Sequence, residues 1–217
     1  MRMQAFRSAL STAQRQLDWL QNIKSLADRN IPIKKTKLTS FLKTVTTSEE
    51  LEASKEIMQI YERKRVDPDA SAAGVFVKKA LELDAAQLVF EVLEANYRIG
   101  LFLEASTLNK LLSKFFKDGE FDKVFQLHDI GTVKYAVKST DRTYDILIRT
   151  AIAQPDFDKA LEIFKTAAES KKLMRVTCNN MLFKLKEQEL ADKIEEVASL
   201  MKVAGIEPNE TTKKILQ

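Results

Sequence analysis

The chain has 217 residues, of which 45% are apolar and 30% charged, enough apolar residues for a sizeable core and too many for a disordered chain. Five glycines and four prolines are few for this length, which argues against glycine-rich sheet proteins and predicts an all-α fold. A single cysteine excludes an internal disulfide framework and a multi-cysteine zinc site, and no apolar run approaches the roughly 18 residues that a membrane-spanning helix needs.

The N-terminal segment, residues 1–30, is basic and amphipathic. Residues 1–45 hold nine Lys and Arg against two Asp, a net charge of +7, whereas the remaining 172 residues carry −3. The first 16 residues contain no acid, and apolar residues recur at helical spacing at Phe6, Leu10, Ala13, Leu17 and Leu20. This composition is typical of a mitochondrial import signal and predicts the mitochondrial matrix. The alternative is an ordinary amphipathic helix that caps residues 31–217, and an uncleaved presequence-like helix satisfies both.

The rest of the chain repeats itself about every 35 residues. Thr143, Thr177 and Thr211 lie 34 residues apart, and each opens an apolar-periodic segment. The sequence Phe121-Asp122-Lys123 recurs as Phe157-Asp158-Lys159 after 36 residues. Five repeats and a truncated sixth are predicted, each made of two helices separated by a short break.

The predicted helices alternate between two kinds along the chain. The first helices of the repeats are expected at residues 36–44, 72–81, 106–117, 141–153 and 176–186. The second helices are expected at residues 50–64, 84–97, 119–130, 156–170 and 188–202. Neither kind can bury its apolar face alone, so the pairs should stack into an α-solenoid of about five repeats, with first helices on one surface and second helices on the other.

The two kinds of helix differ in charge. The first helices sum to +9 when Glu82 is assigned to the following turn, and the second helices sum to −10. A basic surface of this kind is expected where a polyanion lies along the first helices and its phosphates release counterions. The alternative is that the split arises by chance or serves solubility. The candidate phosphate-binding residues are Lys78, Lys79, Lys110, Lys114, Lys117, Arg142, Arg149 and Lys184.

Residues 31–217 resemble the pentatricopeptide repeat family, most specifically between Asp141 and Asn209. There Thr143-Tyr144-Asp145 and Thr177-Cys178-Asn179 open two repeats, and the stretch that ends in Pro208-Asn209 is similar to the family's Gly-Ile-x-Pro-Asp ending. The Trp, Leu-Gly and Tyr pattern of the tetratricopeptide repeat, a family of similar repeat length, is absent from these first helices.

This resemblance implies single-stranded RNA binding, with one nucleotide per repeat read by the fifth residue of the first helix and the last residue of the repeat. It implies two base-reading pairs, Asn179 with Asn209 and Asn109 with Thr140. The remaining pairs depart from the family pattern: Asp145 with Met174, Gly74 with Glu104 and Thr39 with Asp69. A code broken in most repeats favours contacts with the RNA backbone, or a role that faces other proteins only.

No catalytic, metal or cofactor site is predicted, and no small-molecule substrate. His128 has only Asp129 beside it, and neighbours on a helix diverge by roughly 100° instead of forming a dyad. Cys178 stands where the preceding repeat has Tyr144, which is a packing position. The sequence therefore predicts a non-enzymatic protein with RNA and protein partners, as a component of a mitochondrial ribosome or another ribonucleoprotein. The alternative is a scaffold subunit of a large mitochondrial assembly, such as a respiratory complex, without RNA.

Overall fold

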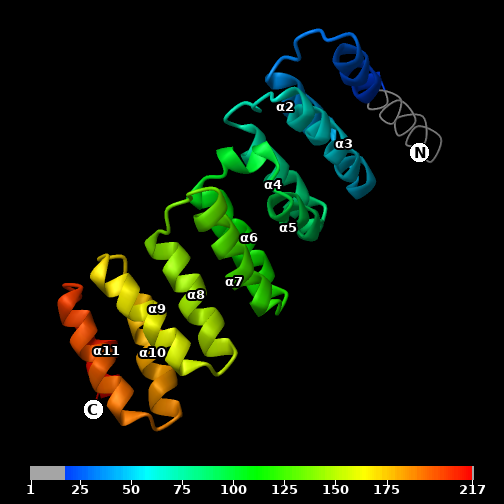
Figure 1. Cartoon of the computed structure of the whole chain (residues 1–217). Coiled ribbons are helices and arrows are strands. Elements are labelled where there is room, and N and C mark those ends of the chain that lie inside the picture. The colour runs from blue at the N-terminus through cyan, green and yellow to red at the C-terminus, as the bar shows by residue number, and fades with distance from the viewer. Residues whose placement is uncertain (1–17, 217) are drawn as a thin grey trace, which may run out of the picture. The chain divides into compact units, whose positions relative to one another are not determined.

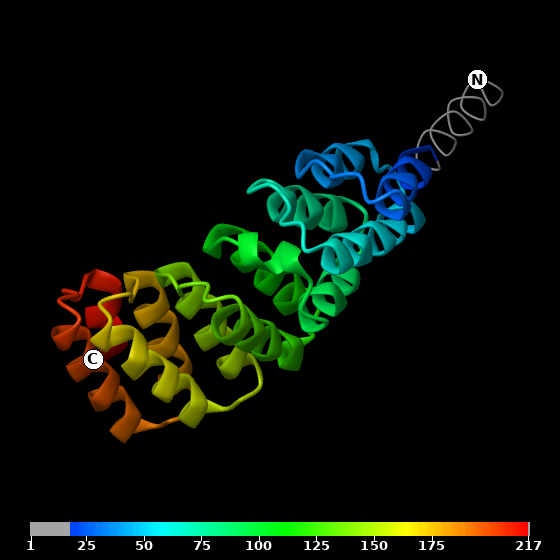
Figure 2. The ribbon, with the colours of Figure 1, turned by 45° about the horizontal axis from the view of Figure 1, so that its top comes forward.

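The computed structural model describes residues 18–216 (Figure 1, Figure 2). Within this range every regular element is helical, which confirms the all-α fold. Of the N-terminal segment, residues 18–28 form a helix, whereas the predicted apolar positions Phe6, Leu10, Ala13 and Leu17 lie outside the described residues.

Between residues 31 and 216 the structure contains five helix pairs and one further helix. The first helices are α2 (Thr36–Thr44), α4 (Ala72–Glu82), α6 (Ala105–Lys117), α8 (Asp141–Ala153) and α10 (Arg175–Glu187). The second helices are α3 (Ser48–Lys64), α5 (Ala86–Glu94), α7 (Phe121–Asp129), α9 (Phe157–Glu169) and α11 (Ala191–Val203). The last helix, α12 (Glu210–Leu216), is the first helix of the predicted truncated repeat. All five first helices begin within one residue of their predicted positions.

Three second helices end earlier than the sequence predicts, α9 by a single residue and α5 and α7 with a change of helix type after them. Helix α5 stops at Glu94 and is followed by the 3-10 helix η1 (Arg98–Phe102), whereas the prediction extended it to residue 97. Asn96 takes a φ of 62°, the left-handed conformation that asparagine tolerates better than most residues, and this conformation ends the helix. Helix α7 stops at Asp129 and continues as a wider π-helical turn, η2 (Ile130–Lys134).

Capping side chains explain where other helices begin. At α3, the Thr47 hydroxyl accepts a hydrogen bond from the Glu50 backbone N–H at 3.3 Å, and the Glu50 carboxylate accepts one from the Thr47 N–H at 3.1 Å. At α9, the Asp156 carboxylate accepts a hydrogen bond from the Lys159 N–H at 3.0 Å. These bonds satisfy backbone donors that have no partner inside the helix.

The chain packs as two compact units. One unit comprises the described residues up to Leu111 together with Val133–Val137. The other comprises Leu112–Thr132 and residues 138–216. Helix α6 therefore supplies residues to both units.

In the first unit, the helix at residues 18–28 packs as an N-terminal cap and buries Ile23 completely. The central residue is Tyr61 of α3, which is 1% exposed. Its hydroxyl accepts a hydrogen bond from the Leu38 N–H at 3.1 Å and donates one to the Lys34 carbonyl at 2.9 Å. Burial raises the pKa of Tyr61 to about 12, so the hydroxyl stays protonated and keeps its donor.

A second tyrosine anchors the Val133–Val137 segment in the same unit. The Tyr135 hydroxyl donates a hydrogen bond to the Leu93 carbonyl at 2.9 Å and lies 3.3 Å from the Tyr97 carbonyl oxygen. Its ring lies so close to Gly100 that a Cβ at this position would overlap it. Glycine is therefore required at position 100 by this close approach.

In the second unit the helices form two layers. The first helices α8, α10 and α12 lie side by side, α9 packs on α8, and α11 packs on α10 and α9. Fully buried side chains between the layers include Ile148, Phe164, Met181, Leu182 and Leu185. An ion pair of 2.6 Å between Lys165 and Glu196 joins α9 to α11 on the outer side. This unit is the one in which the predicted repeat is most regular.

Replacing Gly100 with alanine should destabilise the protein by about 1–3 kcal/mol, the usual cost of adding a methyl group to a packed site. The Tyr135 ring cannot move aside without giving up its hydrogen bonds to Leu93 and Tyr97. Urea unfolding monitored by circular dichroism gives the free energy of unfolding. Gly74→Ala is the matched control, because nothing lies within 4 Å of the added Cβ and alanine stabilises a helix by about 0.5–1 kcal/mol. A Gly100→Ala variant as stable as the wild type would contradict the proposed close packing.

Candidate nucleic-acid interface

The predicted basic residues of the first unit differ in what they contact. The Lys78 side chain is 73% exposed, and its nearest carboxylate, on Glu82, lies 3.8 Å away. Lys79 instead turns toward the protein, since its ammonium donates a hydrogen bond to the Val45 carbonyl at 2.9 Å. Lys110 on α6 is exposed and makes no ion pair with any described residue. Lys78 and Lys110 are therefore better placed than Lys79 to meet an anion.

Lys110, Lys114 and Lys117 follow one stripe of α6 at successive turns. Lys114 pairs with the Asp118 carboxylate at 2.9 Å, which neutralises part of its charge. Lys117 is exposed and has no ionic partner among residues 18–216. The stripe thus keeps two unpaired cations at the predicted positions.

The observed helix bounds correct the predicted charge of the two layers. Glu82 and Glu187 are the last residues of α4 and α10, so Glu82 belongs to its helix and not to the following turn. The five first helices hold twelve Lys and Arg against four Asp and Glu, a net charge of +8. The five second helices hold eight against fifteen, a net charge of −7. The difference keeps its predicted sign and is smaller than predicted.

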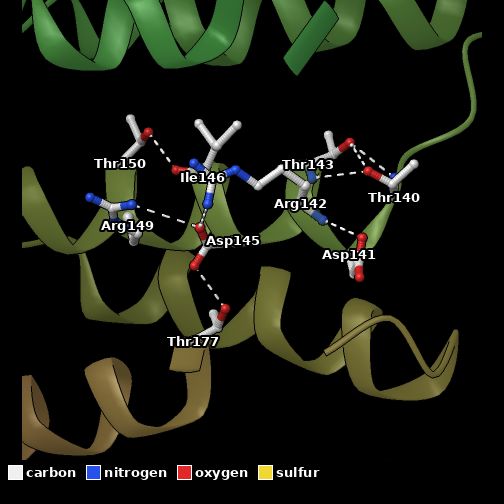
Figure 3. A network of polar contacts seen from close by, with 9 residues as sticks. All are labelled: Thr140, Asp141, Arg142, Thr143, Asp145, Ile146, Arg149, Thr150 and Thr177. Atoms are coloured by element: carbon white, nitrogen blue, oxygen red, sulfur yellow. Dashed lines mark hydrogen bonds and ion pairs between the residues drawn. The ribbon is translucent and has the colours of Figure 1, made fainter. Parts of the chain in front are cut away.

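On α8, one buried carboxylate joins three side chains (Figure 3). Asp145 is 3% exposed, and its Oδ2 atom accepts a hydrogen bond from Arg142 Nη1 at 3.0 Å and lies 3.7 Å from Arg149 Nη1. Its Oδ1 atom accepts a hydrogen bond from the Thr177 hydroxyl of α10 at 2.8 Å. A carboxylate is tolerated at such a depth because it is both paired and hydrogen-bonded. Both arginines keep solvent access, with side chains 54% and 39% exposed.

A cleft of about 550 Å³ opens beside this network, bounded by the first helices α8, α10 and α12. Its lining residues are Arg142, Asp145, Arg149, Val176, Asn179, Asn180, Phe183, Thr211 and Ile215. The cleft therefore has charged side chains on the α8 side and a mixture of polar and apolar side chains on the α10 and α12 sides.

Two exposed apolar residues of this cleft were not among the predicted site residues. Val176 and Phe183 of α10 are 64% and 49% exposed, which is unusual for large apolar side chains. Lys184, a predicted candidate, lies 2.7 Å from the Glu187 carboxylate and 5.6 Å from the centre of the Phe183 ring. The exposure of Phe183 could have been inferred from the sequence. The apolar positions of α10 that are buried recur every three or four residues, and Phe183 does not belong to that series.

No protein-family model matches the chain, and no curated protein is similar to it. A solved structure is similar, the crystal structure of the pentatricopeptide repeat protein PPR10 from maize. It is 14% identical, with a TM-score of 0.50, and the alignment covers 87% of this chain and 27% of the maize chain. The chain has the pentatricopeptide repeat (PPR) fold. This confirms the predicted resemblance at the level of the fold.

In the PPR fold the predicted base-reading residues Asn179 and Asn209 lie next to each other. The Asn179 amide nitrogen lies 3.4 Å from Asn209 Oδ1, and Asn179 Oδ1 accepts a hydrogen bond from the Thr212 hydroxyl at 2.6 Å. Both amides are therefore already engaged with protein atoms. Asn109, from the other pair, is only 8% exposed.

The same contacts correct the register of the last repeat. Thr177 donates to Asp145, and Thr212 donates in the same way to Asn179, the equivalent position one repeat later. Thr177 is 1% exposed and Thr212 is completely buried, whereas Thr211 is exposed. The threonine that opens the truncated PPR repeat is thus Thr212 and not Thr211 as the spacing predicted.

Potentially reactive groups are engaged in packing in this PPR fold. Burial lowers the pKa of His128, whose Nε2 atom lies 2.9 Å from the Ser139 hydroxyl oxygen. Cys178 is completely buried. Residues 18–216 hold no group of three His, Cys, Asp or Glu side chains suited to a metal ion. Over the same range, no helix combines the length and apolar character needed to cross a membrane.

Cys178 should resist thiol reagents in the folded protein. Burial raises the pKa of its thiol to about 12, so the reactive thiolate is about four powers of ten below the thiol at pH 8. Because this is the chain's single cysteine, colour release from a dithiobis-nitrobenzoate reagent reports on it alone. We expect at least about 100-fold slower reaction in the native than in the denatured protein. Equal rates would show that the thiol is accessible.

Proposed function

We propose that this protein is a non-enzymatic RNA-binding component of mitochondrial gene expression, part of a mitochondrial ribosome or another ribonucleoprotein. It binds single-stranded or ribosomal RNA mainly through the phosphate backbone, with the layer of first helices. The observation that carries this proposal is the charge difference between the layers, +8 on the first helices against −7 on the second. Neutralising phosphates with such a layer releases counterions, which favours binding.

The state of the candidate base-reading residues supports backbone contacts over sequence reading. Asn179 and Asn209 are hydrogen-bonded to protein atoms, and Asn109 is buried. Phosphate contacts need only cations with solvent access, such as Lys78 and Lys110, and carry no sequence information. RNA held in this way would be positioned without depending on its bases.

The alternative is a scaffold subunit of a large mitochondrial assembly without RNA. It is favoured by the exposed side chains of Val176 and Phe183, because aromatic residues are enriched at the centres of protein interfaces. In that case the basic layer would hold an acidic protein segment. The same variants test both functions.

Reversing the charges of the α6 stripe should strongly weaken RNA binding. In the Lys110→Glu, Lys114→Glu, Lys117→Glu variant, three cations become repelling anions, so the dissociation constant for a single-stranded RNA should rise at least tenfold. The slope of log affinity against log salt should fall by about 2, since each single-strand phosphate contact contributes about 0.7. Fluorescence anisotropy of a labelled oligonucleotide over a salt series measures both quantities.

The matched control reverses three cations of second helices, as Arg63→Glu, Lys165→Glu, Lys202→Glu. It has the same net charge as the α6 variant, so unspecific electrostatics would weaken both equally. Cross-linking in cells, followed by recovery of bound nucleic acid, extends the test to the natural ligand. If the wild type recovers no RNA while the α6 variant leaves a protein assembly, the scaffold function replaces the proposed one.

Residues 1–30 fused to a fluorescent reporter should direct it to mitochondria. The segment contains arginines and serines, has apolar residues at helical spacing and has no acidic residue before Asp18. This composition is typical of mitochondrial import signals. Replacing Arg2, Arg7 and Arg15 with glutamine should abolish import, because it removes every positively charged side chain before Asp18. A cytosolic wild-type reporter would count against the proposed location.

A further inference from the structure

The Asp145 network has a geometry that the charge of the layer does not explain. The Asp145 Oδ2 atom lies 3.0 Å from Arg142 Nη1 and 3.7 Å from Arg149 Nη1, so this carboxylate lowers the positive charge of first helices whose net charge is +8. Its depth also carries a cost, because a carboxylate loses hydration when buried. If the first helices face RNA, an acid among them weakens the attraction to phosphates, so the presence of Asp145 requires a different explanation.

We propose that Asp145 is a positioning residue that holds Arg142 and Arg149 together as a site for one phosphate of the RNA backbone. This inference rests on the proposed RNA binding and deepens it. Together the three side chains carry two positive charges and one negative, so the network keeps a net charge of +1. The site binds a phosphodiester group irrespective of the base attached to it.

The arginines are held from several sides. Asp145 takes one Nη1 atom of each, and its other oxygen is fixed by the Thr177 hydroxyl, so the carboxylate cannot rotate (Figure 3). The Arg149 guanidinium also lies over the Phe116 ring, 4.9 Å from its centre. Side chains already ordered in this way lose little conformational entropy when a ligand arrives.

The donors left over suit a phosphate. Each guanidinium has five N–H donors, and Asp145 occupies only one edge of each. The side chains are 54% and 39% exposed, and both line the cleft of about 550 Å³. A planar guanidinium binds two oxygens of one phosphate in parallel, which a lysine ammonium cannot do. The site therefore requires arginine, and not only positive charge, at both positions.

The direction in which Asp145→Asn changes RNA affinity distinguishes a positioning role from an effect of charge alone. Asp145→Asn has nearly the same shape and can still accept the Thr177 hydrogen bond, but it removes the charge that holds the arginines. If Asp145 only lowered the local charge, this variant would bind RNA more tightly. The positioning role predicts about tenfold weaker binding, the loss expected for a charge-assisted hydrogen bond.

Asp141→Asn is the matched control. Asp141 lies on the same helix, and its carboxylate accepts a hydrogen bond from the backbone N–H of Arg142 at 2.7 Å instead of contacting a guanidinium. It makes the same change in net charge, so it should leave RNA affinity unchanged or slightly increased. Anisotropy with the full chain and labelled 20-nucleotide poly(U), poly(A) and poly(C) measures all variants at one salt concentration.

The double variant Arg142→Lys, Arg149→Lys tests the requirement for arginine without disturbing the buried residue. Charge is kept, so the salt dependence should stay the same, whereas affinity should fall about tenfold to the same extent on all three RNAs. The control Arg63→Lys, Arg65→Lys, at the end of α3, should have no effect. Because Arg142 and Arg149 are partly exposed, this variant decides the matter even if Asp145→Asn fails to fold, which thermal melting would show.

Each outcome has one consequence. Tighter binding by folded Asp145→Asn, unchanged binding by the double lysine variant, or a loss confined to one base would overturn the positioning role. If binding still depends on the α6 lysines in those cases, the proposed function stands without the Asp145 site. If the wild type binds none of the RNAs at any salt concentration, the proposed function fails and the site fails with it.

Discussion

Stacking is the constraint on which the rest of this structure depends, because no helix pair can bury its apolar face alone. In the second unit one continuous core includes Ile148 of α8, Phe164 of α9, Met181 of α10 and Met201 of α11. Every repeat must therefore give one side to its neighbour, and the charged side chains of the described residues, Asp145 apart, lie on outward sides that keep solvent access. Only on those sides can the charge of the two layers differ.

The two layers differ in how they pair their ions as well as in net charge. Second helices form ion pairs with the next repeat, such as Lys55 with Glu91 at 2.7 Å and Lys165 with Glu196 at 2.6 Å. Several first-helix ion pairs lie within a turn of one helix, such as Lys184 with Glu187 at 2.7 Å, and Lys117 has no ionic partner among the described residues. Acidic side chains of second helices thus form ion pairs with neighbouring second helices, whereas the first helices carry more Lys and Arg than Asp and Glu.

Equivalent positions of two repeats show how the same backbone geometry supports different chemistry. Asp145 and Asn179 each receive a hydrogen bond from a buried threonine of the following repeat, Thr177 and Thr212. The threonine is part of the stacking and is common to both. The acceptor differs, and only the carboxylate gathers two arginines around it. The polar side chains that a repeat presents at this position can therefore change while its packing on the next repeat stays the same.

The helical class, the period of about 35 residues and the starts of the first helices could be predicted from the sequence, because they depend on apolar spacing and capping within a few neighbouring residues. The sign of the charge on each layer could be predicted in the same way. The sequence did not reveal which cations are available, since Lys79 turns to the Val45 carbonyl, or which residue orders the arginines, since Asp145 depends on Thr177. The physical reason is that these contacts join residues more than 30 positions apart, whose meeting is set by how the repeats stack and not by local pattern.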